Sequence, residues 1–126
     1  MNDLEARNKI KLFNETFMKL PWLDFEVCEC SPRAVVMRFG IDLSIQEVCE
    51  LRFQEIFFVK VLMDWHTDTG RPILKLMDAD EVLAMNTDYW IESGFHLFTL
   101  QPENLSDRTC CIIAARTFSW SAPLPN

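Results

Sequence analysis

Glycine and histidine are scarce in this chain, whose 126 residues include three glycines and two histidines. So few glycines leave little room for a phosphate-binding loop, and the Gly-x-Ser-x-Gly motif of hydrolases is missing. Two histidines also provide few general bases, although a carboxylate with a shifted pKa can serve in that role. We therefore expect a protein that is not an enzyme and needs no cofactor.

An export signal and a long apolar run are missing as well. The first residues, MNDLEARNKIKLF, are polar and lack the apolar segment of a signal peptide. The longest apolar run, Ile56 to Met63, is interrupted by Lys60 and is much shorter than the roughly 20 residues that cross a bilayer. These features predict a cytoplasmic protein that does not bind membranes.

The five cysteines are an odd number, and none lies in a Cys-x-x-Cys zinc motif. Cys28 and Cys30 are two residues apart, whereas Cys110 and Cys111 are neighbours. In the absence of an export signal we expect reduced thiols that are buried as small hydrophobic side chains. A metal site built from Cys28, Cys30 and a histidine is the alternative.

Lysine and arginine are absent between Asp78 and Asp107, a stretch that carries seven carboxylates. The formal net charge of the whole chain is −7 and its pI is about 4.7. Nucleic acid and anionic lipid are repelled by such a charge, whereas a basic protein is attracted and associates faster. Solubility of a phenylalanine-rich protein is the alternative explanation for the acidic surface.

The same stretch contains large aromatic side chains, among them Tyr89, Trp90 and Phe95. Tryptophan and tyrosine are enriched at protein interfaces, and carboxylates beside them can pair with arginine and lysine of a partner. Core packing is the alternative for Trp90. We assign Glu103 and Asp107 to an ordinary loop and predict a partner-binding surface made of Asp78, Asp80, Glu81, Asp88, Tyr89, Trp90 and Glu92.

Hydrophobic periodicity predicts a single α+β domain, with an N-terminal helix packed on a curved or split antiparallel sheet of six to seven strands. Ile10, Phe13, Phe17 and Leu20 recur at helical spacing, Asn2 or Asp3 can cap the helix, and Pro21 ends it. Alternation of apolar and polar residues predicts strands at 23–30, 33–39, 48–53, 56–63, 73–77, 94–100 and 108–120.

Some details of this pattern leave alternatives open. Residues 54–55 are expected to form a bulge, and residues 56–63 a strand that is covered on both faces. A turn at 68–70 predicts that this strand forms a hairpin with 73–77. Residues 78–85 fit either a short helix or a loop.

The two histidines define an alternative function, a small-molecule-binding or enzymatic domain in which His66 or His96 works with nearby carboxylates. His66 lies in the sequence DWHTD, where a hairpin loop is expected, and His96 lies on a predicted strand. Asp78-x-Asp80-Glu81 resembles the start of a calcium loop, but Leu83 and Tyr89 occupy the positions that require Gly and Glu. A structural subunit of a larger complex is a third hypothesis.

The order of the elements resembles the β-rich immunity proteins that bacteria encode beside polymorphic or contact-dependent toxins. The residues that carry the resemblance are Trp22–Val27, Arg33–Phe39 and Val48–Ile56, and it extends over roughly residues 22–120. The resemblance implies a cytosolic protein that binds one cognate toxin and blocks its active site. Many such toxins are nucleases with basic surfaces, and an acidic inhibitor can occupy such a surface in place of nucleic acid.

Overall fold

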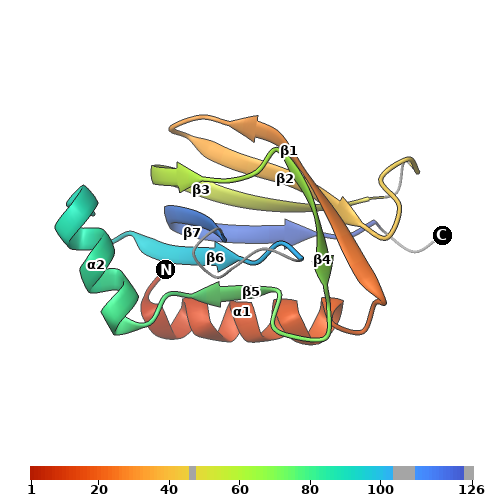
Figure 1. Cartoon of the computed structure of the whole chain (residues 1–126), viewed down its shortest axis with the longest axis horizontal. Coiled ribbons are helices and arrows are strands. Elements are labelled where there is room, and N and C mark those ends of the chain that lie inside the picture. The colour runs from red at the N-terminus through yellow and green to blue at the C-terminus, as the bar shows by residue number, and fades with distance from the viewer. Residues whose placement is uncertain (46–47, 104–109, 124–126) are drawn as a thin grey trace.

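The computed structural model describes residues 1–45, 48–103 and 110–123. They form one seven-stranded antiparallel sheet in the order β4-β1-β2-β3-β7-β6-β5, curled into a half-barrel with the first helix across its open side (Figure 1). The predicted α+β class is confirmed. In chain order the elements are α1 (Asp3–Phe17), β1 (Trp22–Cys30), β2 (Ala34–Gly40), β3 (Cys49–Lys60), β4 (Asp64–Asp68), β5 (Leu74–Leu76), α2 (Ala79–Tyr89), β6 (His96–Leu100) and β7 (Cys111–Ser121).

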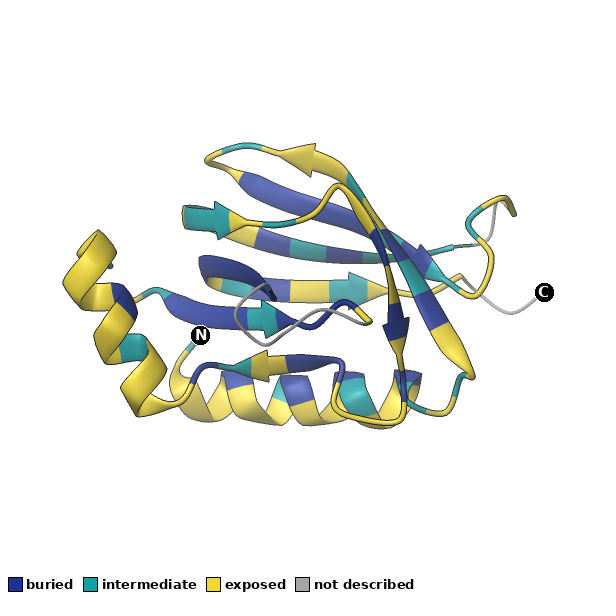
Figure 2. Cartoon of the chain, viewed as in Figure 1, coloured by how far each residue is buried: buried dark blue, intermediate teal, exposed yellow. Residues whose placement is uncertain are grey.

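Helix α1 begins where the sequence predicts but ends at Phe17, before the predicted end at Pro21, so that Leu20 lies outside the helix. The Asn2 side chain accepts a hydrogen bond from the Glu5 backbone N–H at 2.8 Å, which satisfies one of the free donors of the first turn. Ile10, Phe13 and Phe17 are buried along one stripe, which faces the sheet (Figure 2). Neither helix among the described residues combines the length and the apolar character that crossing a bilayer requires.

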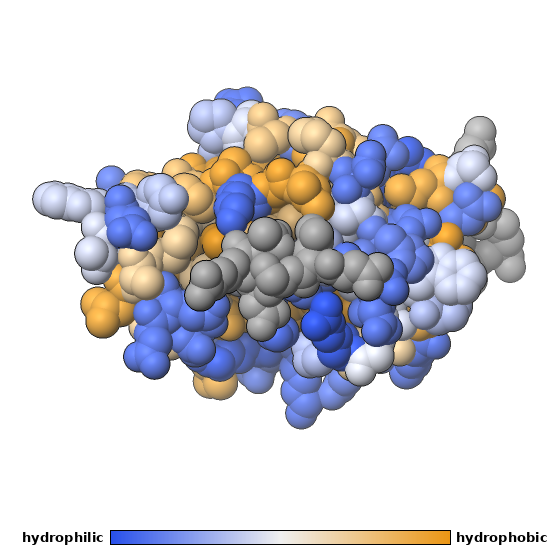
Figure 3. All heavy atoms as spheres, viewed as in Figure 1, coloured by the Kyte–Doolittle hydropathy of each residue, from blue (hydrophilic) through white to orange (hydrophobic). Residues whose placement is uncertain are grey.

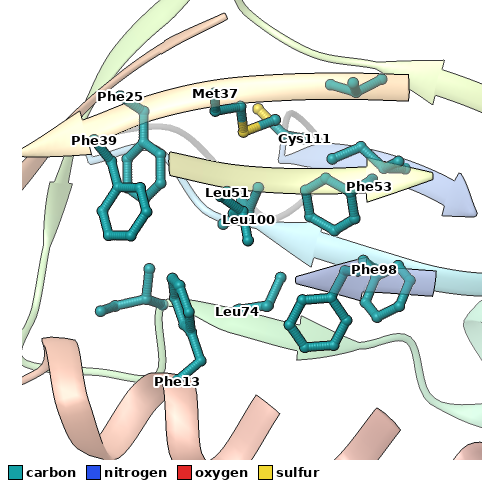
Figure 4. Close-up of a cluster of buried hydrophobic side chains, with 14 of the residues drawn as sticks. Phe13, Phe25, Met37, Phe39, Leu51, Phe53, Leu74, Phe98, Leu100 and Cys111 are labelled. Atoms are coloured by element: carbon teal, nitrogen blue, oxygen red, sulfur yellow. The ribbon is translucent and has the colours of Figure 1, made fainter. Parts of the chain in front are cut away.

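An aromatic core fills the space between α1 and the inner face of the sheet. Val35, Met37 and Phe39 of β2 are fully buried there, on the face that the alternation predicts. The Phe39 ring packs against the rings of Phe17 at 4.8 Å and Phe25 at 5.3 Å. Phe13 rises from α1 toward the same cluster (Figure 4). Burial of these rings is the main force that closes α1 onto the half-barrel.

Asn14 joins α1 to the edge of the sheet at β5. Its Oδ1 accepts hydrogen bonds from the backbone N–H groups of Ile73 and Leu74, at 3.1 and 3.0 Å. Its Nδ2 donates to the carbonyl oxygen of Leu74 at 2.9 Å. The Asn14 side chain thus forms hydrogen bonds with the backbone at this edge of the sheet, as a neighbouring strand would.

We expect Asn14→Ala to lower the free energy of unfolding by about 2 kcal/mol, because three partly buried hydrogen bonds lose their partner. The matched control is Thr16→Ala on the same helix. The Thr16 hydroxyl donates only to the Leu12 carbonyl at an exposed position, so its removal should change stability by less than about 0.5 kcal/mol. Urea denaturation measures both values. Equal effects of the two substitutions would contradict this role of Asn14.

The two strands predicted at 48–53 and 56–63 are one long strand, β3. The irregularity expected at 54–55 is present, because Glu55 has a left-handed backbone with φ of 59° and the register with β7 shifts between Ile56 and Phe58. The expectation that residues 56–63 are covered on both faces is wrong, since Phe57, Leu62 and Met63 are exposed. Apolar side chains gather on the face that carries the β3–β4 connection (Figure 3).

The predicted hairpin between 56–63 and 73–77 is also wrong. The residues expected to form its loop are strand β4, which pairs with β1, and β5 pairs with β6 instead. Trp65 and Thr67 are buried in β4 while Asp64, His66 and Asp68 are exposed. The polar residues of DWHTD therefore form the outer side of an edge strand. Of the two alternatives for residues 78–85, the helix is confirmed, because Asp78 caps α2 and residues 79–85 belong to it.

Four of the five cysteines form two groups, and Cys49 is half-buried. Cys110 and Cys111 are buried as predicted, and burial raises the pKa of the Cys111 thiol. Cys28 and Cys30 are exposed, contrary to the prediction, because β1 continues beyond the end of its pairing with β4 at Glu26. No group of three or more His, Cys, Asp or Glu side chains in the described ranges is arranged to hold a metal ion.

Candidate functional site

Helix α2 carries most of the predicted contact residues and lies at one end of the sheet, beside β5 and β6 (Figure 1). Along β7, Cys111, Ile113 and Ala115 belong to the inner core. The alternate residues Ile112 and Ala114 pack on the opposite face, in a smaller cluster that includes Met85 of α2. Met85 is the one buried residue of α2, so most of this helix faces solvent (Figure 2).

Three of the predicted contact residues have a local role at the start of α2. The Asp78 side chain accepts a hydrogen bond from the Glu81 backbone N–H at 2.9 Å, and the Asp78 N–H donates to the Glu81 carboxylate at 3.3 Å. This reciprocal pair is a capping box, and Asp80 lies in the first turn, where negative charge favours the helix. The Asp-x-x-Glu spacing is a sequence signal for this cap that the search for a contact surface overlooked.

The other four predicted contact residues lie at the far end of the helix. Asp88 is ten residues after Asp78, which corresponds to about 15 Å along the helix axis. Tyr89, Trp90 and Glu92 follow, and all seven predicted residues are exposed. The structure therefore does not bring the seven together into one patch but divides them into two groups.

Trp90 is the residue that the fold explains least. It caps α2 with φ of 54° and ψ of 51°, the left-handed conformation that helix ends usually reserve for glycine. That conformation costs a residue with a Cβ roughly 1 kcal/mol. The Trp90 side chain is 82% exposed, so core packing, the alternative for this residue, is wrong. Neither backbone geometry nor burial favours tryptophan at this position.

An aromatic surface surrounds this end of α2, and we define it as Phe57, Phe58, Tyr89, Trp90 and Phe95. The ring centroids of Phe58 and Tyr89 are 4.6 Å apart, and those of Phe57 and Phe95 are 5.2 Å apart. The bulge in β3 places the adjacent residues Phe57 and Phe58 on the same side of the sheet, because it removes one step of the usual alternation. Sequence reasoning missed Phe57 and Phe58, which lie far from α2 along the chain.

Arg116 of β7 is fixed at the border of the aromatic surface. Its guanidinium carbon lies 4.4 Å from the centre of the Phe95 ring, and its Nε is 3.6 Å from the Glu55 carboxylate. A Cβ at Gly94 would lie 2.7 Å from Nη1 of Arg116, so glycine leaves room for this guanidinium. The exposed carboxylates of Asp88 and Glu92 are close in sequence to Tyr89 and Trp90. The site therefore combines exposed aromatic rings with negative charge.

His66, a residue of the alternative function, is held by two carboxylates. Its Nδ1 lies 2.6 Å from Asp24 Oδ1 and its Nε2 lies 3.3 Å from Glu103 Oε2. The Glu103 backbone N–H also donates to the His66 carbonyl at 2.8 Å. His66 thus connects β4 to β1 and to the segment after β6. Both ring nitrogens therefore lie beside a carboxylate. Of the two acidic residues assigned to the loop after β6, Asp107 lies outside the described residues.

His96 is buried and packs against the start of the chain. Its Nε2 lies 2.8 Å from the Met1 carbonyl oxygen, and its Nδ1 lies 3.0 Å from Asp3 Oδ1. His96 also lines a cavity of about 380 Å³ together with Asp3 and Arg7. The two histidines lie on different strands, β4 and β6, which are not neighbours in the sheet.

Comparison of the chain with protein-family models, with curated proteins and with solved structures found no match. The resemblance to bacterial immunity proteins therefore stays a prediction. What the protein does has to be argued from the geometry of its surface.

Proposed function

We propose that this chain is a non-enzymatic binding module that captures a basic protein, and that it acts as an immunity protein by neutralising a cognate toxin. The observation that carries the proposal is Trp90, an exposed tryptophan in a backbone conformation that favours glycine. A large apolar side chain that stabilises neither the helix end nor the core is free to make a contact outside the chain. The net charge of −7 supports a basic partner.

The aromatic surface and its carboxylates have complementary roles in such a contact. Trp90 and Tyr89 provide large, rigid apolar anchors that bury well in a pocket of the partner. Asp88 and Glu92 can then accept charge-assisted hydrogen bonds from arginine or lysine at the edge of the buried area. For a nuclease, these carboxylates would occupy the positions of substrate phosphates, so that the inhibitor and nucleic acid exclude one another.

A small-molecule-binding function is the second candidate, and the cavity beside His96 is the observation that favours it. Asp3, Arg7 and His96 place a carboxylate, a guanidinium and an imidazole around about 380 Å³. A metal scan and ligand screen on the purified protein tests this candidate. Stoichiometric zinc, or a ligand whose binding is lost in His96→Ala and retained in His66→Ala, would favour it over protein capture.

Affinity capture from cells that naturally produce the chain tests the proposed function. The tagged protein is compared with Trp90→Ala and with Leu12→Ala, which removes an equally apolar side chain, 55% exposed, from α1. We expect a basic protein that the natural chain and Leu12→Ala retain and that Trp90→Ala loses. Capture of an acidic protein, or equal capture by all three, would contradict the proposal.

The two groups of carboxylates should respond differently to substitution. We expect Asp78→Ala to lower the free energy of unfolding by about 1 kcal/mol through loss of the cap, with partner affinity unchanged. Asp88→Lys combined with Glu92→Lys should leave stability nearly unchanged and lower affinity at least about tenfold, mainly through slower association. Surface plasmon resonance at several salt concentrations measures the affinity and the association rate of the Asp78 variant and of the double lysine variant. An affinity that is insensitive to the lysine substitutions would remove Asp88 and Glu92 from the interface.

A further inference from the structure

The end of β3 lies next to a groove and has no neighbouring strand on one side. In β1, Glu29 and Cys30 pair with β2, and the side of β1 that β4 leaves uncovered beyond Glu26 faces away from β3. In β3, Phe58 and Val59 pair with β7, whereas the pairing with β2 has ended at Gln54. No strand in the described parts of the chain pairs with these residues on their other side.

The groove between the end of β3 and the tip of the β1–β2 hairpin is small and largely apolar. It has a volume of about 310 Å³ and is lined by residues 30–32 at the tip of the β1–β2 hairpin and by residues 56–59 of β3. The last backbone contact between the two walls is the hydrogen bond from the Ile56 N–H to the Pro32 carbonyl, at 2.9 Å. Beyond it the strands separate, and Phe57 and Phe58 connect the groove to the aromatic surface.

We propose that this groove accepts an extended, cationic segment of the partner protein, which adds a strand beside Phe58 and Val59. The inference rests on the proposed function, because it specifies how the captured protein is held. Strand addition uses the backbone of the open edge for affinity and alternate side-chain pockets for specificity. The groove provides the apolar pocket, and the adjoining aromatic surface receives the remainder of the partner.

Continuity with the aromatic surface and overall charge favour this occupant over a second copy of the chain. Proteins usually protect an open edge with charged or proline residues, and here Lys60 and Pro32 lie at its two ends, but Phe57, Phe58 and Val59 leave an apolar stretch between them. Two copies would each bring a net charge of −7 to the contact, which opposes self-association. A cationic segment is attracted by the same charge.

Peptide binding to the isotope-labelled protein tests the groove directly. The probe is a peptide of about eight residues in which valine and lysine alternate, a pattern that suits a strand with one apolar face. We expect saturable changes in the amide signals of residues 29–31 and 57–59, with a midpoint below about 1 mM. A valine–glutamate peptide, and a valine–lysine peptide with a central proline, should bind at least about tenfold more weakly.

Substitution of Cys30 provides the matched pair of variants. Cys30 is exposed, so both Cys30→Arg and Cys30→Ser are compatible with folding. Arginine fills the groove and should weaken peptide binding at least about tenfold, whereas serine should change it less than about twofold. No saturable change at residues 29–31 and 57–59, or equal binding to the two variants, would overturn the inference. So would a chain that sediments as a dimer and leaves these amides unaffected by peptide.

The peptide experiment and the capture experiment fail in different ways. If Trp90→Ala loses the captured protein but the natural chain binds no peptide, the proposed function is supported and strand addition at the groove is overturned. If the peptide binds at the groove but Trp90→Ala and Leu12→Ala capture the partner equally, strand addition at the groove is supported and the role of Trp90 is contradicted.

Discussion

Replacing Trp90 with glycine should raise the free energy of unfolding by about 1 kcal/mol and lower the affinity for the partner at least about 30-fold. Stability rises because glycine adopts the left-handed conformation at the end of α2 without the steric cost of a Cβ, and because little burial is lost with a side chain that is 82% exposed. Affinity falls because truncation of a tryptophan anchor typically removes 2 kcal/mol or more. A substitution that raises stability while it lowers affinity is characteristic of a residue that serves binding at a cost in stability.

Urea denaturation and calorimetric titration with the captured partner measure the two effects of Trp90→Gly. Leu12→Ala is the control for both, since it removes an exposed apolar side chain from a surface that has no role in the proposed contact. We expect this control to change stability and affinity only slightly. A loss of stability in Trp90→Gly would mean that tryptophan serves the fold, and our main argument for a binding surface would fail.

Replacing Phe39 with alanine should lower the free energy of unfolding by about 3–5 kcal/mol. The Phe39 ring is fully buried and contacts rings from both layers, Phe13 and Phe17 of α1 and Phe25 of β1. A cavity at this point cannot be filled by one neighbour, because the four rings constrain each other. Since a small domain has a total stability of about 5–15 kcal/mol, the loss is a large part of the whole.

Phe57→Ala is the control for this prediction. Phe57 is also an aromatic residue on a strand, but it is 37% exposed and contacts Phe95 on the outer surface. We expect it to cost no more than about 1.5 kcal/mol. Thermal unfolding followed by circular dichroism compares the two. Similar effects at Phe39 and Phe57 would contradict the position of the core between α1 and the inner face of the sheet.

Local sequence patterns predicted the parts of the fold that depend on neighbours in the chain. The helical stripe of Ile10, Phe13 and Phe17 predicted α1, and alternation over residues 33–39 predicted β2 and its buried face. Pairings between distant segments could not be predicted in the same way. β4 follows β3 directly in sequence but pairs with β1 across the sheet, and alternation in DWHTD does not specify which partner it finds.

The candidate site was only partly predictable for the same reason. The acidic stretch drew attention to Trp90, which the structure leaves exposed, but charge alone did not separate helix capping by Asp78 and Glu81 from the carboxylates at the other end of α2. Phe57 and Phe58 join the site through a bulge in β3, whose consequence for side-chain direction depends on register with β7. A continuous apolar run in the sequence instead favoured a strand buried on both faces.

The most direct test of the proposed function is growth of cells that produce the captured partner. We expect the partner alone to arrest growth, and co-production of the natural chain or of Leu12→Ala to restore it. Trp90→Ala, present at the same cellular level, should restore growth much less well, because the partner is no longer held at the aromatic surface. A partner that is harmless by itself, or full protection by Trp90→Ala, would contradict neutralisation of a toxin through this surface.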